Sequence, residues 1–160
     1  MVAIQAIPYG REHTNPPVRL EPNWNAPETR QLVARACYDC HSNETIWPWY
    51  SDVAPLSWLV QRDVDRGRPV LNFSEWDRPQ ETVDAVRQIQ AGEMPPFPYV
   101  AMHPEANLSA AERQQLILGL RATFVHGAAP RGVEGERRSG ERERRAGRRA
   151  AGTSSRHSTS

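Results

Sequence analysis

The two cysteines of this 160-residue chain stand three positions apart and a histidine follows them, in the segment Cys37-Tyr38-Asp39-Cys40-His41. Residues three apart on a helical turn face the same side, so both thiols point one way. This spacing is the attachment pattern of a c-type haem, in which two thioethers hold the porphyrin and the histidine is the proximal iron ligand. The motif therefore predicts a covalent haem on Cys37 and Cys40 with His41 on the iron, and it leaves the two residues between the cysteines as spacers.

Two other interpretations of the cysteine pair stay open. A Cys-x-x-Cys pair can be a thiol–disulfide redox motif, although that motif belongs in a βαβ context and this region has a helical pattern. The pair and His41 can also hold zinc if a fourth ligand comes from elsewhere in the chain. With two cysteines in total, a disulfide scaffold and a four-cysteine zinc site are excluded.

Haem iron in an electron carrier usually has a second axial ligand, and Met94 is the preferred candidate. It follows Gly92, which is suited to end a helix, and two prolines hold the chain extended after it. The alternative for Met94 is a methionine that fills a gap in the core. His103 and Met102 are the rival ligands, and imidazole in place of a thioether would lower the reduction potential.

Apolar residues at helical spacing predict four short helices between the tails. The first runs from Pro27 to Cys37 with Asn25 as its cap, and the second from near Pro55 to Gly67. The third runs from 79 to 91, with Val83, Val86 and Ile89 facing inward. The fourth begins with a capping box at Ser109–Glu112 and continues to about Phe124. No segment alternates with period two, so the expected fold class is all-α, with long loops rich in Pro and Trp. So few aliphatic side chains favour a cofactor at the centre.

Aromatic and basic side chains supply candidates for the rest of a haem pocket. Those for an apolar wall are Trp47, Trp49, Tyr50, Trp58 and Tyr99. Those for pairing with the propionates are Arg62, Arg66 and Arg68.

Composition divides the chain into three predicted parts. Residues 1–24 are proline-rich and expected to be extended, 25–127 form the haem-binding domain, and 128–160 form an Arg-rich tail that is expected to be disordered. Residues 130–160 carry nine Arg and four Glu. Basic arms bind phosphates, but the interspersed glutamates weaken that interpretation, and no nucleic-acid partner is expected.

Several separate blocks of the sequence resemble the bacterial haem-binding domain family, which is related to cytochromes c. The blocks are 7–17, CYDCHSNET at 37–45, WPWY at 47–50, APLSWL at 54–59, LNFSEW at 71–76, GEMPP at 92–96 and HPEANLS at 103–109. The resemblance covers about residues 4–125. It implies a cytochrome c-like bundle, a covalent haem on Cys37 and Cys40, ligation by His41, and Met94 as the distal ligand.

The resemblance also implies export, because thioether formation takes place on the outer side of the bacterial inner membrane. The expected location is the periplasm or the outer face of that membrane, and the expected partners are the cytochrome c maturation machinery and unknown redox proteins. Residues 1–24 show no recognisable export signal. We therefore expect either a start further upstream, with an export or anchor segment, or a truncated form without a membrane tether.

The function expected from these observations is single-electron transfer by a c-type haem protein. No paired carboxylates or base–nucleophile set argues for hydrolysis or group transfer, so the chain is not expected to be an enzyme. One alternative is a small-ligand sensor or peroxidase-like protein with an open distal site. Another is a non-haem interaction module that uses the basic tail.

Overall fold

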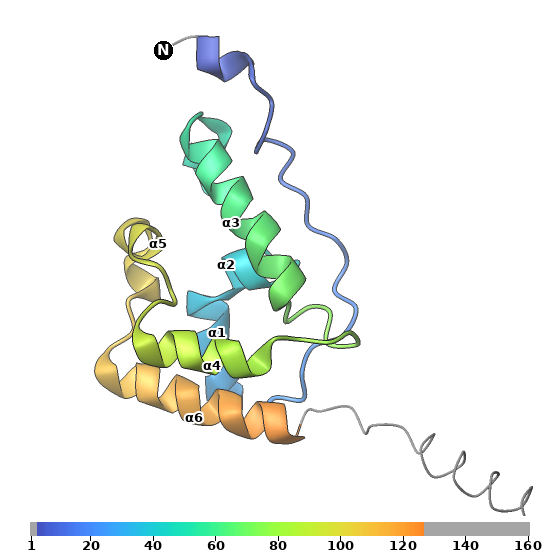
Figure 1. Ribbon diagram of the computed structural model, residues 1–160, viewed down its shortest axis with the longest axis vertical. Coiled ribbons are helices and arrows are strands. Elements are labelled where there is room, and N and C mark those ends of the chain that lie inside the picture. The colour runs from blue at the N-terminus through green and yellow to red at the C-terminus, as the bar shows by residue number, and fades with distance from the viewer. Residues whose placement is uncertain (1–2, 127–160) are drawn as a thin grey trace, which may run out of the picture. The chain divides into compact units, whose positions relative to one another are not determined.

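The computed structural model describes residues 3–126, so the predicted tail at 128–160 lies outside the described residues. The helices are α1 (Pro27–Ala36), α2 (Tyr38–His41), α3 (Leu56–Val70), α4 (Thr82–Ala91), α5 (Phe97–Met102) and α6 (Ala110–His126), with 3₁₀ turns η1 (Ala3–Ala6), η2 (Trp49–Asp52) and η3 (Pro104–Ala106) (Figure 1). Between residues 3 and 126 there is no strand, only an isolated bridge from Leu20 to Glu75. The predicted all-α fold class is confirmed.

The main core lies where α1, α4 and α6 meet. Helix α6 packs against both α1 and α4 (Figure 1). Thr29 of α1 approaches Gly119 of α6 so closely that a Cβ on the glycine would lie 2.2 Å from the threonine Oγ1. The largest fully buried apolar side chains here are Val33, Leu116, Leu120 and Phe73.

A stack of aromatic rings joins the 71–76 loop to this core. Phe73 lies parallel to Trp76 with ring centres 5.9 Å apart, and Trp76 stacks in turn on Phe124 of α6 at 5.5 Å. Trp24 and the buried Tyr38 contact the same Phe73 ring. Because Tyr38 lies between the two cysteines, the stack fixes the cysteine–histidine motif against the core.

Helix α3 stands apart from that core. Among the described elements it packs against α2 and η2 alone. The N-terminal segment runs along it (Figure 1), with Gly10 against Ser57 and with the Tyr9 hydroxyl donating to Asp65. A Cβ on Gly10 would lie 2.4 Å from the Ser57 carbonyl oxygen, and the positive φ of 83° also favours glycine there. None of the helices within residues 3–126 has the length and hydropathy needed to cross a bilayer.

Several predicted helix ends are confirmed. Gly92 ends α4 in the left-handed region with φ 75°. Ser109 and Glu112 form the predicted capping box of α6, in which the Ser109 N–H donates to Glu112 Oε2 at 2.8 Å and the Glu112 N–H donates to Ser109 Oγ at 3.2 Å. The capping residues therefore marked these ends correctly in the sequence.

Other predicted details are wrong. The cap position of α1 is Ala26, while the Asn25 side chain accepts a hydrogen bond from Thr123 of α6 instead. Helix α3 continues past Gly67 to Val70. Helix α4 begins at Thr82, three residues later than predicted, and Val83 on its outer side is 81% exposed. Helices α2 and α5 were not predicted, because four and six residues are too short for a clear helical period.

Candidate functional site

The cysteine–histidine motif forms a helical corner between α1 and α2. Cys37 ends α1, where its N–H donates to the Val33 carbonyl at 2.8 Å, and the His41 N–H donates to the Cys37 carbonyl at 2.9 Å. Both cysteines are free and half-buried. Burial raises the pKa of each thiol to about 12, so both are protonated at neutral pH. The cysteines thus keep the spacing and the shared helical turn that two thioether bonds require.

His41 has one ring nitrogen fixed by the backbone. Its Nδ1 lies 3.0 Å from the Leu71 carbonyl oxygen, an acceptor, so Nδ1 carries the proton and donates it. Burial lowers the pKa of His41, which favours the neutral imidazole and leaves a lone pair on Nε2. A histidine that ligates a metal usually has this arrangement, because the hydrogen bond at one nitrogen orients the other.

The cysteine–histidine motif packs closely against α3 at Gly67. A Cβ on this glycine would lie 2.3 Å from the Cys40 carbonyl oxygen, which is far inside van der Waals contact. Only a glycine lets α3 approach the motif this closely. The position of α3 against the cysteine–histidine motif therefore depends on Gly67.

Arg68 forms hydrogen bonds with the N-terminal segment and with the loop that follows His41. Its guanidinium donates to the Ser42 carbonyl at 2.8 Å, the Thr14 carbonyl at 2.8 Å, Asn15 Oδ1 at 2.9 Å and Thr45 Oγ1 at 3.0 Å. These groups come from the N-terminal segment and from the loop after His41. Arg68 thus has a structural role here, in place of the propionate contact that the sequence suggested.

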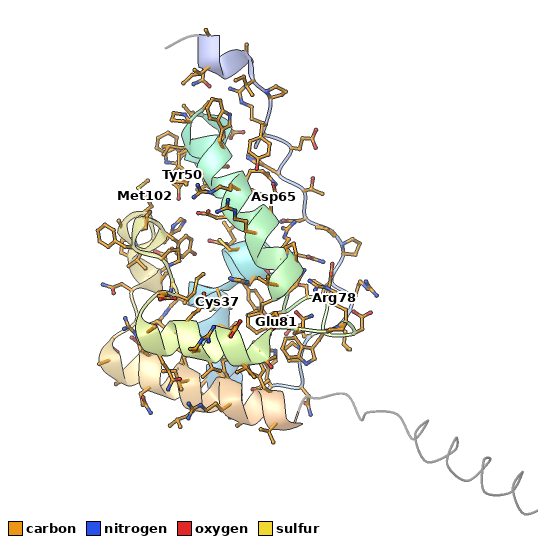
Figure 2. All side chains as sticks on the ribbon, in the orientation of Figure 1. Cys37, Tyr50, Asp65, Arg78, Glu81 and Met102 are labelled. Atoms are coloured by element: carbon orange, nitrogen blue, oxygen red, sulfur yellow. The ribbon has the colours of Figure 1, made fainter. Side chains whose placement is uncertain are left out.

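A cavity of about 70 Å³ lies between α3 and α5 and reaches the attachment motif. Its lining is mostly apolar, and Figure 2 shows the side chains on the two facing helices. The lining residues are Asp39, Cys40, Thr45, Ile46, Pro48, Tyr50, Leu56, Leu59, Val60, Asp63, Val64, Pro98, Tyr99, Met102 and His103. The five from α3 recur at helical spacing, so one whole face of that helix borders the cavity.

Two polar side chains meet across this cavity. Tyr50 Oη lies 3.3 Å from His103 Nε2, and His103 Nδ1 lies 3.1 Å from the Tyr99 carbonyl oxygen. Since the carbonyl can only accept, Nδ1 donates to it, and Nε2 accepts from the Tyr50 hydroxyl. The His103 ring also stacks on Tyr99 with centres 4.2 Å apart. His103 is therefore held in one orientation with Nε2 facing Tyr50.

Asp39 is more than the spacer that the sequence suggested. Its Oδ2 accepts a hydrogen bond from the Tyr99 hydroxyl at 2.8 Å, and its Oδ1 accepts one from the Ile46 N–H at 3.0 Å. Asp39 therefore links the attachment motif to α5. The spacing of residues around Asp39 could not predict this hydrogen bond, because Tyr99 lies sixty residues away in the sequence.

The structure separates the candidate distal ligands. His103 and Met102 both line the cavity, and Met102 is 52% exposed. Met94 is half-buried in the loop between α4 and α5, where it packs against the core cluster that Cys37 also contacts. Met94 is thus close to the core but does not line this cavity.

The predicted aromatic wall is only partly assembled. Tyr50 and Tyr99 line the cavity. Trp47 instead stacks on His13 at 4.7 Å, Trp49 is 78% exposed, and Trp58 lies outside the lining with a buried Nε1. Arg62 and Arg66 are exposed on α3 and do not line the cavity either.

The donor set fits a haem, since two free thiols share one helical turn with a neutral imidazole. Helices α3 and α5 face each other over an apolar cavity, and among the described elements neither packs against the other. The apolar face of α3 therefore borders an open space of about 70 Å³ next to Cys40. For the zinc interpretation, the described residues contain no set of three or more His, Cys, Asp or Glu side chains arranged around a metal. For the thiol–disulfide interpretation, the expected βαβ context does not occur within residues 3–126.

Comparison with known proteins agrees with this fit. No match was found among curated proteins or among solved structures. The sequence model of a family described as a haem-binding domain matches residues 1–122, which include the attachment motif, the cavity and all three candidate distal ligands. The chain therefore belongs to the haem-binding domain family, and the group that it binds is haem.

Proposed function

We propose that this protein carries a covalently attached haem c and transfers single electrons. In this proposal Cys37 and Cys40 form the two thioethers, His41 is the proximal ligand and Met94 is the distal ligand. The observation that carries the proposal is the geometry of His41. Its Nδ1 is fixed on the Leu71 carbonyl, burial favours the neutral imidazole, and both thiols lie on the same helical corner.

The bound haem iron would supply a one-electron change of oxidation state. The protein's own residues bind it, orient its ligand and exclude water. The Leu71 carbonyl makes the His41 imidazole a stronger donor by accepting its Nδ1 proton. Leu59, Val60 and Val64 border the cavity with aliphatic side chains, which keep the local dielectric low and so help to set the potential.

The choice of Met94 rests on its loop. Gly92 ends α4 sharply, and the chain then passes Met94 before it enters α5, so the thioether lies on a short connection between two helices. His103 remains the rival, since it lines the cavity. Oxidised holoprotein should show the weak far-red band of sulfur–iron ligation. Met94→Ala should abolish that band and His103→Ala should retain it, whereas the reverse result would assign the iron to His103.

A second measurement separates electron transfer from the open-site alternative. A six-coordinate haem should resist carbon monoxide, and Met94→Ala should make it bind. Rapid binding of carbon monoxide to the wild-type protein would instead favour a sensor or peroxidase-like role. We propose no enzymatic activity for the six-coordinate form.

We propose the periplasm, or the outer face of the inner membrane, as the site of function. The support is the motif itself, since both thioethers form only after export in the presence of the maturation machinery. The test compares the chain expressed with and without an added export signal. Haem should survive denaturing electrophoresis only in the exported protein. A Cys37→Ala/Cys40→Ala variant, exported in the same way, is the matched control and should lose its haem on the gel.

A further inference from the structure

Four side-chain rings form a continuous chain that ends at the protein surface. His103 stacks on Tyr99 with ring centres 4.2 Å apart, and Tyr50 meets His103 edge-on at 6.2 Å. Tyr50 in turn meets Trp49 edge-on at 5.8 Å. Trp49 is 78% exposed, whereas Tyr50 is buried. The chain therefore leads from the interior of the protein to its surface.

The inner end of the chain lies at the cysteine–histidine motif. The Tyr99 hydroxyl donates to Asp39 at 2.8 Å, and Asp39 directly precedes Cys40. Burial raises the pKa of Tyr99, and the Asp39 carboxylate and both cysteine thiols raise it further, so Tyr99 lies close to Cys37 as well as to Cys40. Tyr99 also lines the cavity beside Cys40. The first ring of the chain is therefore close to both residues that would bond a haem.

The outer end of the chain lies in an exposed apolar surface. Ile46, Leu56 and Met102 line the cavity and are also exposed. Trp49 adjoins them because it contacts Tyr50, another lining residue. We call the four exposed residues, Ile46, Trp49, Leu56 and Met102, the Trp49 patch. Exposed apolar patches commonly mark interaction sites, and tryptophan is enriched among the residues that contribute most to binding.

The segments that carry the Trp49 patch have acidic residues but neither Arg nor Lys. They are residues 36–61 and 94–111, which supply the whole cavity lining except Asp63 and Val64. On α3, Asp63 pairs with Arg62, so this pair adds no net charge. The carboxylates of the two segments are Asp39, Glu44, Asp52 and Glu105. The two segments that surround the cavity are therefore negatively charged.

Two of these carboxylates are exposed next to the chain of rings. Asp52 belongs to the same 3₁₀ turn as Trp49, and its carboxylate lies 3.8 Å from His13 Nδ1. Burial raises the pKa of the Tyr50 phenol, and Glu105 is among the carboxylates that raise it further, so Glu105 lies near that ring. An apolar centre with a negative rim is complementary to a positively charged surface that has an apolar centre of its own.

We propose that a basic redox protein docks on the Trp49 patch and exchanges electrons with the haem through the four rings. The proposal rests on the haem c and the single-electron transfer proposed above. The oxidised centre of the partner gains the one electron that ferrous iron loses, and the iron becomes ferric. No proton moves and no ring is oxidised, because the rings only couple the two centres electronically. Rings in contact serve this purpose because electron transfer slows steeply with the width of the gaps between bonded groups.

Docking is tested on exported, reduced holoprotein with hexaamminechromium(III), a paramagnetic cation that is not reduced and that stands in for a positive surface. It should broaden the indole N–H signal of Trp49 in the NMR spectrum, whereas the paramagnetic anion hexacyanochromate(III) should not. Asp52→Asn/Glu105→Gln should weaken the broadening several-fold. Asp84→Asn, which removes a half-exposed carboxylate on α4, is the matched control and should leave it unchanged. Broadening by the anion, or by neither ion, would overturn the proposal.

The route is tested with tris(bipyridine)cobalt(III), a cationic one-electron oxidant with aromatic ligands. The rate at which it oxidises the reduced holoprotein should fall several-fold in Trp49→Leu and in Tyr50→Leu, with the reduction potential unchanged. Tyr50→Phe keeps the ring and should keep the rate. Val83→Ser, at an exposed apolar residue of α4, is the control and should also keep it. An unchanged rate in either leucine variant would overturn the proposal.

Two further observations keep these outcomes distinct. Tyr50→Leu retains Trp49, so broadening by the chromium cation should persist while the rate falls, which separates the route from docking. Trp49 is exposed, so its variant keeps the test valid if Tyr50→Leu fails to fold. A wild-type protein without haem on a denaturing gel would contradict the proposed function instead. Covalent haem together with an unperturbed Trp49 signal would contradict the docking proposal alone.

Discussion

The Tyr99 hydroxyl donates a 2.8 Å hydrogen bond to Asp39, the residue directly before the second cysteine of the attachment motif. This bond joins α5 to α2 across the cavity. The Met94 loop leads directly into α5, so the bond also positions the segment that carries the proposed distal ligand relative to the proximal one.

Removing this bond should loosen α5. Tyr99→Phe keeps the ring that stacks on His103 but loses the donor to a carboxylate, which should cost about 1.5–3 kcal/mol of unfolding free energy. The measurement is urea unfolding of the holoprotein. Tyr9→Phe removes a similar bond to Asp65 at the exposed surface and should cost much less. Equal losses in the two variants would show that the Asp39 bond has no special role.

Gly67→Ala should disturb the attachment motif. An alanine in a helix interior usually gains about 1 kcal/mol over glycine. Here the added Cβ would lie 2.3 Å from the Cys40 carbonyl oxygen, and backbone cannot move aside as a flexible side chain can. Overpacking of this kind costs about 1–3 kcal/mol or more, so the clash should outweigh the helix gain. The yield of covalent haem and the melting temperature should both fall, whereas Arg66→Ala on the exposed side of α3 should leave both nearly unchanged.

Arg68→Lys should weaken the connection between the N-terminal segment and the loop after the motif. A lysine has the charge but not the planar fork that reaches four acceptors at once. The expected loss is about 1–3 kcal/mol of unfolding free energy, and the N-terminal segment should become more sensitive to limited proteolysis. Arg62→Lys is the control because Arg62 is exposed and donates to its sequence neighbour Asp63. Unchanged proteolysis in Arg68→Lys would contradict this role.

The sequence was most informative where chemistry is local. The helical spacing of Val86 and Ile89, the glycine at the end of α4 and the capping box of α6 all depend on neighbours within four residues, and each is found in the structure. The Cys-x-x-Cys-His spacing is local in the same sense. Its preserved helical corner was predictable because one turn of helix determines it.

Contacts between distant residues could not be predicted. The bond from Tyr99 to Asp39, the approach of Gly67 to Cys40 and the pairing of Tyr50 with His103 each join segments more than twenty-five residues apart. The spacing of residues within one segment does not indicate which residue of a distant segment they will contact. Arg68 shows the consequence, since its residue type made it one candidate for pairing with propionates, whereas its guanidinium donates to the Ser42 and Thr14 carbonyls.

The start of α6 provides a prediction on pH. Glu112 accepts hydrogen bonds from Ser109 and pairs with Arg35 of α1. The Arg35 guanidinium, together with the Ser109 donors, lowers the pKa of Glu112 to about 2 from an ordinary value of 4.5. A carboxylate whose pKa is lower in the folded state stabilises that state above its unfolded pKa. The stabilisation is then lost as the pH falls toward the folded value.

Glu112→Gln should therefore be less stable than the wild type at pH 7, and the difference should shrink between about pH 4.5 and pH 2. Urea unfolding at several pH values measures it. In an Arg35→Gln background the same substitution should cost less at pH 7, because Arg35 is the largest cause of the lowered pKa. A difference that stays constant down to pH 2 would mean that the neutral capping hydrogen bonds, and not the charge, determine how Glu112 stabilises the junction of α1 and α6.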